Sequence, residues 1–430
     1  MELKKYKLGD LAQVTRGASL SGEYYATQGN YIRLTCGNFD YRNNCFKENQ
    51  SKNNIYYTGG FKEEFLLERG DIITPLTEQA IGLLGSTARI PESGKYIQSQ
   101  DIAKIDCNES LLDKDFAFYL ISSACVKKQL SAAAQQTKIR HTSPDKIKEC
   151  TVWIPSLDVQ KRIGRILTDI DNKIAINRQI NDNLEAMAKQ LYDYWFVQFD
   201  FPNEEGKPYK SSGGAMVWNE KLKREIPQGW SISNVKPLIE PIERGISYSS
   251  DDLLDPFATP MINLACFSKA GDYRLGEMKF FSGKVSNDKL ISPMDMLIAC
   301  TDMTQGADII GRPILASDEY DQYTFSTDLA LITPKGKFKM YLYYTLRTPF
   351  YHKYIRPFAS GTTVKHLNLI GVENYGLPVP PIEIQSKFED LITPVKEKQS
   401  KNLNEINALT KQRDELLPLL MNGQASVNSD

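Results

Sequence analysis

The sequence repeats itself once, and this repeat is the strongest constraint on what the chain can fold into. The pentapeptide TKIRH at 137–141 returns as TTVKH at 362–366, and the offset of 225 residues then holds for more than 50 positions. Upstream the offset drifts by a few residues, which small loop insertions explain. Because there are only two copies, with a period far above the roughly 20 to 50 residues of solenoid repeats, we predict a tandem duplication of a whole domain. Chance similarity between helical segments is the alternative.

Each copy has two parts that differ in hydrophobic periodicity. The first part is rich in Gly, Pro, aromatic and β-branched residues and has short apolar runs, which favours strands with a few helices. The second part has almost no Gly, and its apolar residues have helical spacing. We therefore expect an α+β protein with two tandem strand-rich α/β domains, separated by two long helical regions that form an antiparallel coiled coil. The expected boundaries are 1–156 for the first domain, 157–200 for its helical region, 201–226 for a linker, 227–381 for the second domain, 382–423 for its helical region and 424–430 for a flexible tail.

The helical regions follow a heptad pattern that places Asn at the same a position in both. Facing amides of Asn177 and Asn402 can pair across two helices, and a slipped register would leave them unsatisfied. A polar residue on a helix flank is the alternative. Thr168 and Thr393 are expected N-caps, and Pro394 favours a helix start, so each region should be a short helix, a break and a long helix. The a positions are Ile163, Ile170, Asn177, Leu184 and Leu191 in the first region and Phe388, Val395, Asn402, Leu409 and Leu416 in the second, with Leu184 and Leu409 as further helix-pairing residues.

The overall charge creates no field that would attract nucleic acid, since 52 basic residues stand against 53 acidic ones. A polyanion site must therefore be a local patch. The stretches 117–141 and 334–366 each contain several basic residues and no acidic one, and both end in the repeated pentapeptide. Cations offset phosphate charge, while Arg, Lys and Thr also contact base edges, so we predict two DNA-binding tracts. A solvated basic helix, or histidines that are satisfied within the fold, is the alternative. The candidates are Lys127, Lys128, Thr137, Lys138, Arg140 and His141 in the first copy and Lys353, Arg356, Thr362, Thr363, Lys365 and His366 in the second.

Segments that differ between the copies are candidates for sequence discrimination. TPLTEQAIGLLG in the first copy corresponds to ACTDMTQGADIIG in the second, and RGASLSGEYY corresponds to RGISYSSDD. Equivalent scaffolds with different loops should read different bases. Ordinary polar loop surface is the alternative for each residue. The candidate base readers are Arg16, Ser19, Tyr24, Thr77, Gln79, Arg244, Tyr248, Thr304 and Gln305.

Catalytic signatures are absent from the sequence. It contains no N-P-P-[YF] tetrapeptide of amino-methyltransferases, no Gly-rich phosphate or cofactor loop and no H-E-x-x-H motif. We expect no cofactor and no metal in this chain, and we assign any chemistry to partners. A self-contained methyltransferase or nuclease would need such motifs, whereas a protein-only scaffold would not need two acid-free basic tracts.

The seven cysteines are scattered, with no C-x-x-C motif, which favours reduced thiols in the cytoplasm. The N-terminus has no apolar signal core, and no apolar run reaches the roughly 18 residues of a membrane span. We therefore expect a cytoplasmic protein that does not enter a membrane.

The order of these parts resembles the specificity subunit of type I restriction-modification enzymes over essentially the whole chain. The passages PSLDVQKRIGRILTDIDNKIAINRQINDNLEAMAKQLYDYWFVQFDFP and EIPQGW carry the resemblance. It implies that each domain is a target-recognition domain that reads one half of a split DNA sequence, and that the helices dock two methyltransferase (modification) subunits. It also implies double-stranded DNA and a restriction (endonuclease/translocase) subunit as partners, and S-adenosylmethionine as a cofactor of the methyltransferase.

The helical regions are also candidates for a spacer and for a partner interface. At 1.5 Å per residue a helix over 169–198 would span about 45 Å. Two such helices side by side would separate the domains by a distance on the order of one DNA turn, about 34 to 36 Å. The first region ends in aromatic residues, and an exposed aromatic helix end favours a partner interface, here with the methyltransferase that the resemblance implies. Packing beneath the chain's own domain is the alternative. The candidate interface residues are Tyr192, Tyr194, Trp195 and Phe196.

Overall fold

The chain forms two compact units. Unit 1 comprises Met1–Lys173 and Leu409–Asp430, and unit 2 comprises Ile174–Ala408. The C-terminal end belongs to unit 1 because Leu420 and Met421 are buried in the same apolar core as Phe116. The computed structural model describes residues 2–50, 52–78, 80, 82–133, 140–253, 258–268 and 272–425.

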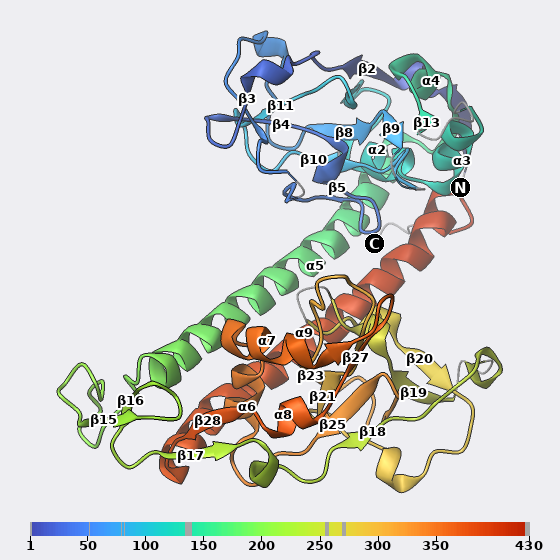
Figure 1. The fold of residues 1–430 in the computed structure, drawn as a ribbon. Helices are drawn as coiled ribbons and strands as arrows, with labels where there is room; N and C mark the ends of the chain where they lie inside the picture. Colours follow the sequence, from blue (N-terminus) through green and yellow to red (C-terminus); the bar gives the residue numbers. More distant parts are fainter. Residues whose placement is uncertain are drawn as a thin grey trace. The chain divides into compact units, whose positions relative to one another are not determined.

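The centre of unit 1 is a four-stranded antiparallel sheet of order β10-β8-β12-β2 (Figure 1). The apolar run IITP is buried along its whole length in the inner strand of this sheet. Helix α2 adds six consecutive buried residues, Phe116 to Ile121, to the core of the unit. The elements of this core are β2 (Ala12–Arg16), β8 (Ile72–Pro75), β10 (Ala88–Arg89), β12 (Ile102–Cys107) and α2 (Lys114–Ile121).

A second sheet of order β11-β4-β7-β3 and several small elements complete unit 1. They are β1 (Lys4–Lys7), α1 (Leu8–Leu11), β3 (Tyr25–Ala26), β4 (Tyr31–Arg33), β5 (Phe39–Asp40), β6 (Cys45–Phe46), β7 (Tyr56–Tyr57), β9 (Thr77–Glu78), β11 (Tyr96–Ile97), α3 (Ala124–Ala133), β13 (Arg140–His141), α4 (Pro144–Glu149) and β14 (Thr151–Ile154).

Unit 2 repeats the topology of unit 1. Its central sheet has the order β18-β25-β21-β23, and β18, β25, β21 and β23 take the places of β2, β12, β8 and β10. The predicted duplication of an α+β domain is therefore confirmed. The elements of unit 2 are β17 (Ser231–Asn234), β18 (Glu243–Arg244), β19 (Thr259–Ile262), β20 (Lys279–Phe281), β21 (Met296–Ala299), β22 (Thr301–Asp302), β23 (Pro313–Leu315), β24 (Thr324–Phe325), β25 (Leu329–Ile332), α6 (Lys339–Thr345), α7 (Pro349–Ile355), β26 (Ala359–Ser360), β27 (Lys365–Leu367), α8 (Ile370–Glu373) and β28 (Gly376–Val379).

The two helical regions are single uninterrupted helices, α5 (Leu157–Tyr192) and α9 (Ile382–Met421). The predicted break before a long helix, with N-caps at Thr168 and Thr393, is wrong. Pro394 lacks an N–H and frees the carbonyl of Asp390, but both residues are exposed, so water can bond that carbonyl without a break in the helix.

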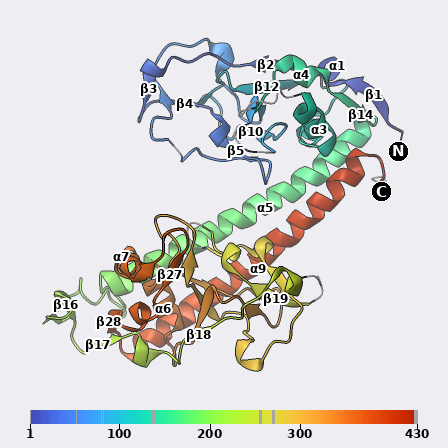
Figure 2. The same ribbon diagram turned by 45° about the vertical axis from the view of Figure 1, so that its right-hand side comes forward.

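Within unit 2 the helices run antiparallel, side by side (Figures 1 and 2). Asn177 Nδ2 donates to Glu405 Oε2 at 2.8 Å, and Asn402 Nδ2 donates to Asn181 Oδ1 at 2.9 Å. The prediction that Asn177 and Asn402 pair with each other is therefore wrong, because the antiparallel register sets Asn402 level with a residue one turn further along α5. Both asparagines are nevertheless buried and bonded across the helix pair.

The remaining predicted pairing residues are half-buried. Leu184 lies in unit 2 and Leu409 in unit 1. In unit 1 the two helices are joined by Arg413, whose Nη1 lies 2.9 Å from Asp171 Oδ1. None of the described helices combines the length and the apolar content that a membrane span requires.

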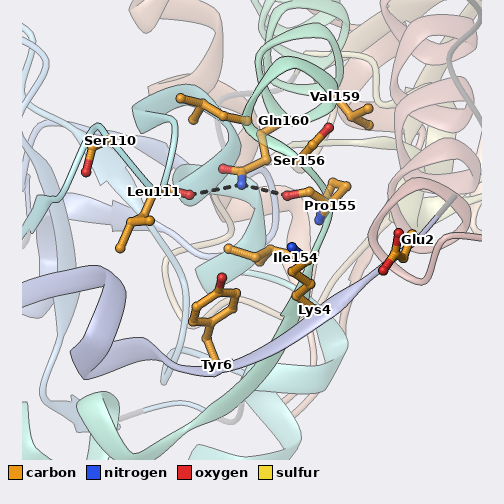
Figure 3. Close-up of a pocket in the computed structure, with 11 residues that line it drawn as sticks. Glu2, Lys4, Tyr6, Ser110, Leu111, Ile154, Pro155, Ser156, Val159 and Gln160 are labelled. Atoms are coloured by element: carbon orange, nitrogen blue, oxygen red, sulfur yellow. Dashed lines mark hydrogen bonds between the residues drawn. The ribbon is translucent and has the colours of Figure 1, made fainter.

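The start of α5 is tied to unit 1 through a buried glutamine. The side chain of Gln160 donates to the carbonyls of Leu111 at 3.0 Å and Pro155 at 2.9 Å (Figure 3). It also accepts from the backbone N–H of Asp113 at 3.0 Å. Its repeat partner Gln385 donates to the carbonyl of Pro380 in the same way. The repeated Pro and Gln thus fix the angle at which each helix leaves its domain.

The range that we expected to be a linker is structured. It contains the hairpin of β15 (Met216–Asn219) and β16 (Arg224–Pro227). Phe201 stacks on Tyr209 with ring centroids 4.7 Å apart, and Phe201 and Ile226 are buried in the core of unit 2. Their apolar side chains account for the order of this segment.

Candidate nucleic-acid interface

In unit 1 the basic and histidine residues of the repeated pentapeptide form a short strand against the end of the core sheet. Strand β13 pairs with β9, so that Arg140 lies opposite Glu78 and His141 opposite Thr77. The hydroxyl of Thr77 lies 3.4 Å from both His141 Nδ1 and Asp101 Oδ1, and Arg140 Nη1 lies 3.6 Å from Glu78 Oε2. Thr77 and Glu78 are buried, whereas His141 is exposed. The base and the histidine are therefore on the solvent side of this pair.

Unit 2 builds the same pair of strands with the same Thr and His but with Lys and Asp in place of Arg and Glu. Strand β27 pairs with β22, so that Lys365 lies opposite Asp302 and His366 opposite Thr301. Thr301 Oγ1 donates to Asp328 Oδ1 at 3.0 Å, as its counterpart does in unit 1. Asp302 is fully buried and His366 is exposed. The pentapeptide therefore occurs twice in the sequence because its last two residues form the same strand pair in both units.

The repeated Arg-Gly dipeptide has a steric explanation. A Cβ at Gly17 would lie 2.2 Å from the carbonyl oxygen of Gln98, and a Cβ at Gly245 would lie 2.2 Å from that of Phe325. Only glycine fits such close backbone approaches. The preceding residue is exposed in unit 1, as Arg16, and half-buried in unit 2, as Arg244.

A basic pocket of about 610 Å³ in unit 2 brings four of the predicted residues together: Gln305, Lys353, Arg356 and Lys365. Every charged residue that lines this pocket is basic. It is a suitable site for phosphate, which needs several cations within a short distance. The other lining residues are Lys189, Gly306, Ala307, Arg312, Arg347, Pro349, His352, Pro357 and Ala359.

The cations of the basic pocket differ in their existing partners. Among the described residues, the side-chain charges of Lys353, Arg356 and Lys365 make no ion pair. Lys189 pairs with Asp193 at 2.8 Å. Lys353, Arg356 and Lys365 are therefore the cations most readily available to an incoming anion.

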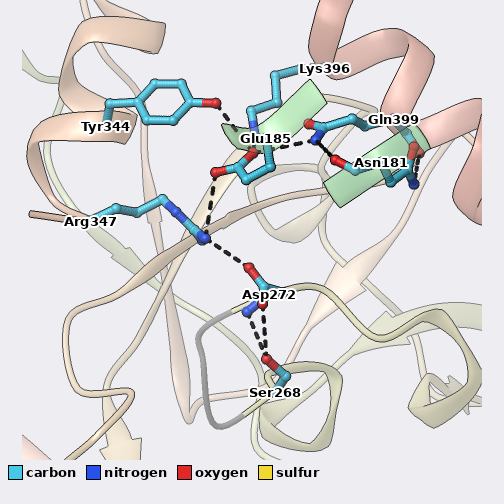
Figure 4. A network of polar contacts seen from close by, with 8 residues as sticks. All are labelled: Asn181, Glu185, Ser268, Asp272, Tyr344, Arg347, Lys396 and Gln399. Atoms are coloured by element: carbon cyan, nitrogen blue, oxygen red, sulfur yellow. Dashed lines mark hydrogen bonds and ion pairs between the residues drawn. The ribbon is translucent and has the colours of Figure 1, made fainter. Parts of the chain in front are cut away.

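Arg347 connects the basic pocket to a network of polar contacts (Figure 4). Its guanidinium lies 2.7 Å from Asp272 and 3.7 Å from Glu185, and the ammonium of Lys396 on α9 also bonds Glu185. Burial alone would raise the pKa of Glu185, but the charges of Lys396 and Arg347 outweigh it and hold this pKa below its usual value. The network ties the helix pair to the wall of the pocket within unit 2.

Two basic residues of unit 1 are on α3 but differ in exposure. Lys128 is exposed, whereas burial lowers the pKa of Lys127, whose side chain packs against Gly85. Lys128 is therefore the better candidate for phosphate contact. His352 takes the position of Lys127 in unit 2, and its Nε2 lies 3.0 Å from the carbonyl oxygen of Ala307. The sequence reasoning missed His352 and Arg312, although the 225-residue offset would have aligned this histidine with Lys127.

The structure does not bring all candidates together. Ser19 and Tyr24 are exposed in unit 1, and 44% of the surface of Tyr24 is accessible to solvent. In unit 2 the Tyr248 hydroxyl accepts from Lys279 at 3.0 Å, and Thr362 and Thr363 are exposed. Gln79, Thr137 and Lys138 lie outside the described residues. Within the part of the chain that is described, no group of three or more His, Cys, Asp or Glu could hold a metal ion.

The predicted aromatic partner interface is mostly buried in unit 2. Tyr192, Trp195 and Phe196 belong to its apolar core, and the ring of Phe196 lies 4.6 Å from Tyr341 between centroids. The prediction is wrong for these three residues, because a π-helical turn at Asp193–Val197 packs the rings beneath the chain's own domain. Tyr194, which is 36% exposed, is the remaining candidate.

Comparisons with known proteins agree over most of the chain. The model of the type I restriction modification DNA specificity domain matches residues 1–186 and 241–411. The chain is 25% identical to the type I restriction enzyme MjaIX specificity subunit of Methanocaldococcus jannaschii, over 80% of this chain and 78% of that protein. It is 22% identical to the HindI specificity subunit of Haemophilus influenzae, over 98% of this chain and 99% of that protein. A crystal structure of a type I restriction-modification S subunit from M. genitalium has the same fold, with a TM-score of 0.61, 15% identity and coverage of 98% and 96% of the two chains.

Proposed function

Since the chain belongs to the family of type I restriction-modification specificity subunits, we propose that each of its two units reads one half of a split site in double-stranded DNA. Specificity subunits are the non-catalytic, DNA-recognising components of these systems. The observation that carries the proposal is the basic pocket of unit 2, which adjoins a loop that differs from its counterpart in unit 1. Phosphate contacts position the protein on DNA, and the divergent loop reads base edges.

We propose that α5 and α9 set the spacing between the two half-sites. Each helix passes from one unit into the other without a break, and α5 has 36 residues while α9 has 40. Continuous helices are what a spacer of fixed length requires, because their rise per residue is constant.

We propose that α5 and the π-helical turn after it also dock a modification subunit, through an exposed stripe that keeps only Tyr194 of the predicted aromatic end. Ile176, Ile180, Met187 and Tyr194 are 56%, 37%, 64% and 36% exposed. Their spacing places them on one side of the helix, where they form an apolar stripe that the helix pairing leaves uncovered. An exposed apolar stripe on a charged helix favours a protein partner.

The assembly that we propose contains two modification subunits, which hold S-adenosylmethionine, and a restriction subunit. The duplicated architecture supports the number two, because each unit presents one copy of the repeated scaffold. We place the assembly in the cytoplasm, where all seven free cysteines would stay reduced.

Mapping of methylated bases by sequencing tests the proposed function. DNA is taken from cells that produce this chain with its cognate modification subunit and from cells that lack only this chain. We expect a split motif that requires the chain. If verified production of both subunits gives no chain-dependent motif, the proposal is wrong and a protein-only scaffold becomes the better interpretation.

A further inference from the structure

A buried carboxylate holds the divergent loop of unit 2 at both ends. Asp302 is fully buried at the end of β22, and its Oδ1 accepts from the backbone N–H of Thr304 at 2.6 Å. Its Oδ2 accepts from the backbone N–H of Ile309 at 2.7 Å. One side chain therefore holds the loop 303–308 near its start, at Thr304, and directly after its end, at Ile309.

Further contacts hold the inner side of this loop, whereas its outer side exposes side chains that can contact DNA bases. His352 Nε2 lies 3.0 Å from the carbonyl of Ala307, and Gly311, at φ +69, lets the chain turn against Ile355. Met303 is 73% exposed, and Gln305 is exposed and lines the basic pocket. Gln can bond adenine edges, and an apolar side chain can contact the methyl group of thymine.

Unit 1 has a carboxylate at the equivalent place. Glu78 is buried at the end of β9, and its Oε1 accepts from the backbone N–H of Gly82 at 2.9 Å. Glu78 and Asp302 both lie opposite the basic residue of the repeated pentapeptide, which is Arg140 in unit 1 and Lys365 in unit 2. The two loops differ in sequence, but each begins at a buried acid that bonds the loop backbone.

We propose that Asp302 and Glu78 are positioning residues that determine how strictly each unit discriminates bases. The inference rests on the proposed function, and it assigns the discrimination to the geometry of a loop that a buried side chain holds in place. A carboxylate accepts hydrogen bonds with both oxygens, whereas an amide offers one acceptor and one N–H₂ group. Asn at 302 would therefore leave one loop N–H facing another donor.

The first experiment compares wild-type and Asp302→Asn chains, each in complex with the cognate modification subunit, by sequencing-based mapping of methylated bases. Loss of one anchor should let residues 303–308 shift and accept wrong bases. We expect methylation of sites with one wrong base in a single half of the motif to rise about tenfold relative to the cognate site, which is the scale of a single-mismatch penalty. The other half of the motif should keep its base preferences.

Glu78→Leu is the matched variant, because it removes the one acceptor that bonds the loop backbone of unit 1, and it should relax only the other half of the motif. Asp302→Glu restores the charge with the residue type that unit 1 uses, so it should recover part of the lost discrimination. Ile314→Val removes one methyl group from the core of unit 2 and controls for general destabilisation. It should lower total methylation without a change in base preference.

Two results would overturn the inference. One is an Asp302→Asn complex that methylates all sites less but keeps wild-type base preference in both halves, because this is the behaviour of the core control. If that variant yields no complex, Asp302→Ser decides, because its hydroxyl cannot accept from both loop N–H groups at once, and unchanged base preference in both halves then rejects the inference. Absence of a split motif with the wild-type chain would instead reject the proposed function.

Discussion

At the residue scale, burial separates side chains that read or bind from side chains that hold the scaffold. In both units the repeated strand pair sets a buried acid and a buried threonine opposite a half-buried base and an exposed histidine. A buried acid is costly unless it is hydrogen-bonded or paired, and Asp302 meets this need with backbone N–H groups. The half-buried cation Lys365 makes no ion pair among the described residues and lines the basic pocket, so it is available to phosphate.

Lys365→Ala should weaken binding of the assembled complex to duplex DNA of any sequence. Phosphate contacts do not distinguish bases, and loss of one contact should reduce the slope of log K against log salt by about 1. Titration of labelled duplexes with and without the cognate site, at several salt concentrations, measures this slope. Lys207→Ala is the control, because Lys207 is 65% exposed and pairs with Glu205 outside the basic pocket. An unchanged slope for Lys365→Ala would remove this residue from the interface.

At the element scale, α5 has two faces with different tasks. One face is buried and bonds α9 through Asn177, Asn181 and Glu185 within unit 2. The opposite face exposes the apolar stripe that we assign to a modification subunit. Polar bonds on the buried face fix the register of the helix pair, because a shift would leave these groups without partners.

Ile176→Lys combined with Met187→Lys should reduce co-purification of the modification subunit at least tenfold. Two charges in an apolar interface lose their hydration without gaining a partner. Ala175→Lys is the control, since Ala175 is exposed on α5 but lies away from the stripe. Equal recovery of the modification subunit with the double variant and with the control would show that the stripe does not dock it.

At the scale of the whole molecule, duplication supplies two equivalent scaffolds and divergence makes them different. The central sheets share one topology, whereas the loops after β9 and β22 differ in length and sequence. A protein built in this way can recognise two unlike half-sites with one architecture. In the proposed function, the two helices set the distance between those half-sites.

Insertion of one heptad into α5 within 169–192, with a matching heptad in α9, should lengthen the spacer of the methylated motif. Seven residues add about 10.5 Å of helix, which corresponds to about three base pairs. Both half-sites should keep their sequences. The same seven residues added after Asp430 should change nothing. A motif with the original spacer, in a complex of normal yield, would contradict the role of the helices as a spacer.

The sequence by itself determined the duplication, the α+β class and the helical regions. These features are encoded locally, in a constant offset and in hydrophobic periods that survive in any tertiary context. It also indicated the basic tracts, because a run without acidic residues is visible in one dimension. The resemblance to specificity subunits rested on the order of these parts, and the family match confirmed it.

Only the tertiary structure decided which of the candidate side chains meet. Asn177 and Asn402 share a heptad position, but the antiparallel register gives them different partners. From the sequence, the aromatic rings of Tyr192 and Phe196 are expected to be exposed at a partner interface. In the structure they are buried in the apolar core of unit 2. The basic pocket joins residues from α5, a loop and α7, and the acids that hold the loops belong to neither basic tract. Long-range packing sets these contacts, and no local pattern records which distant segments come together.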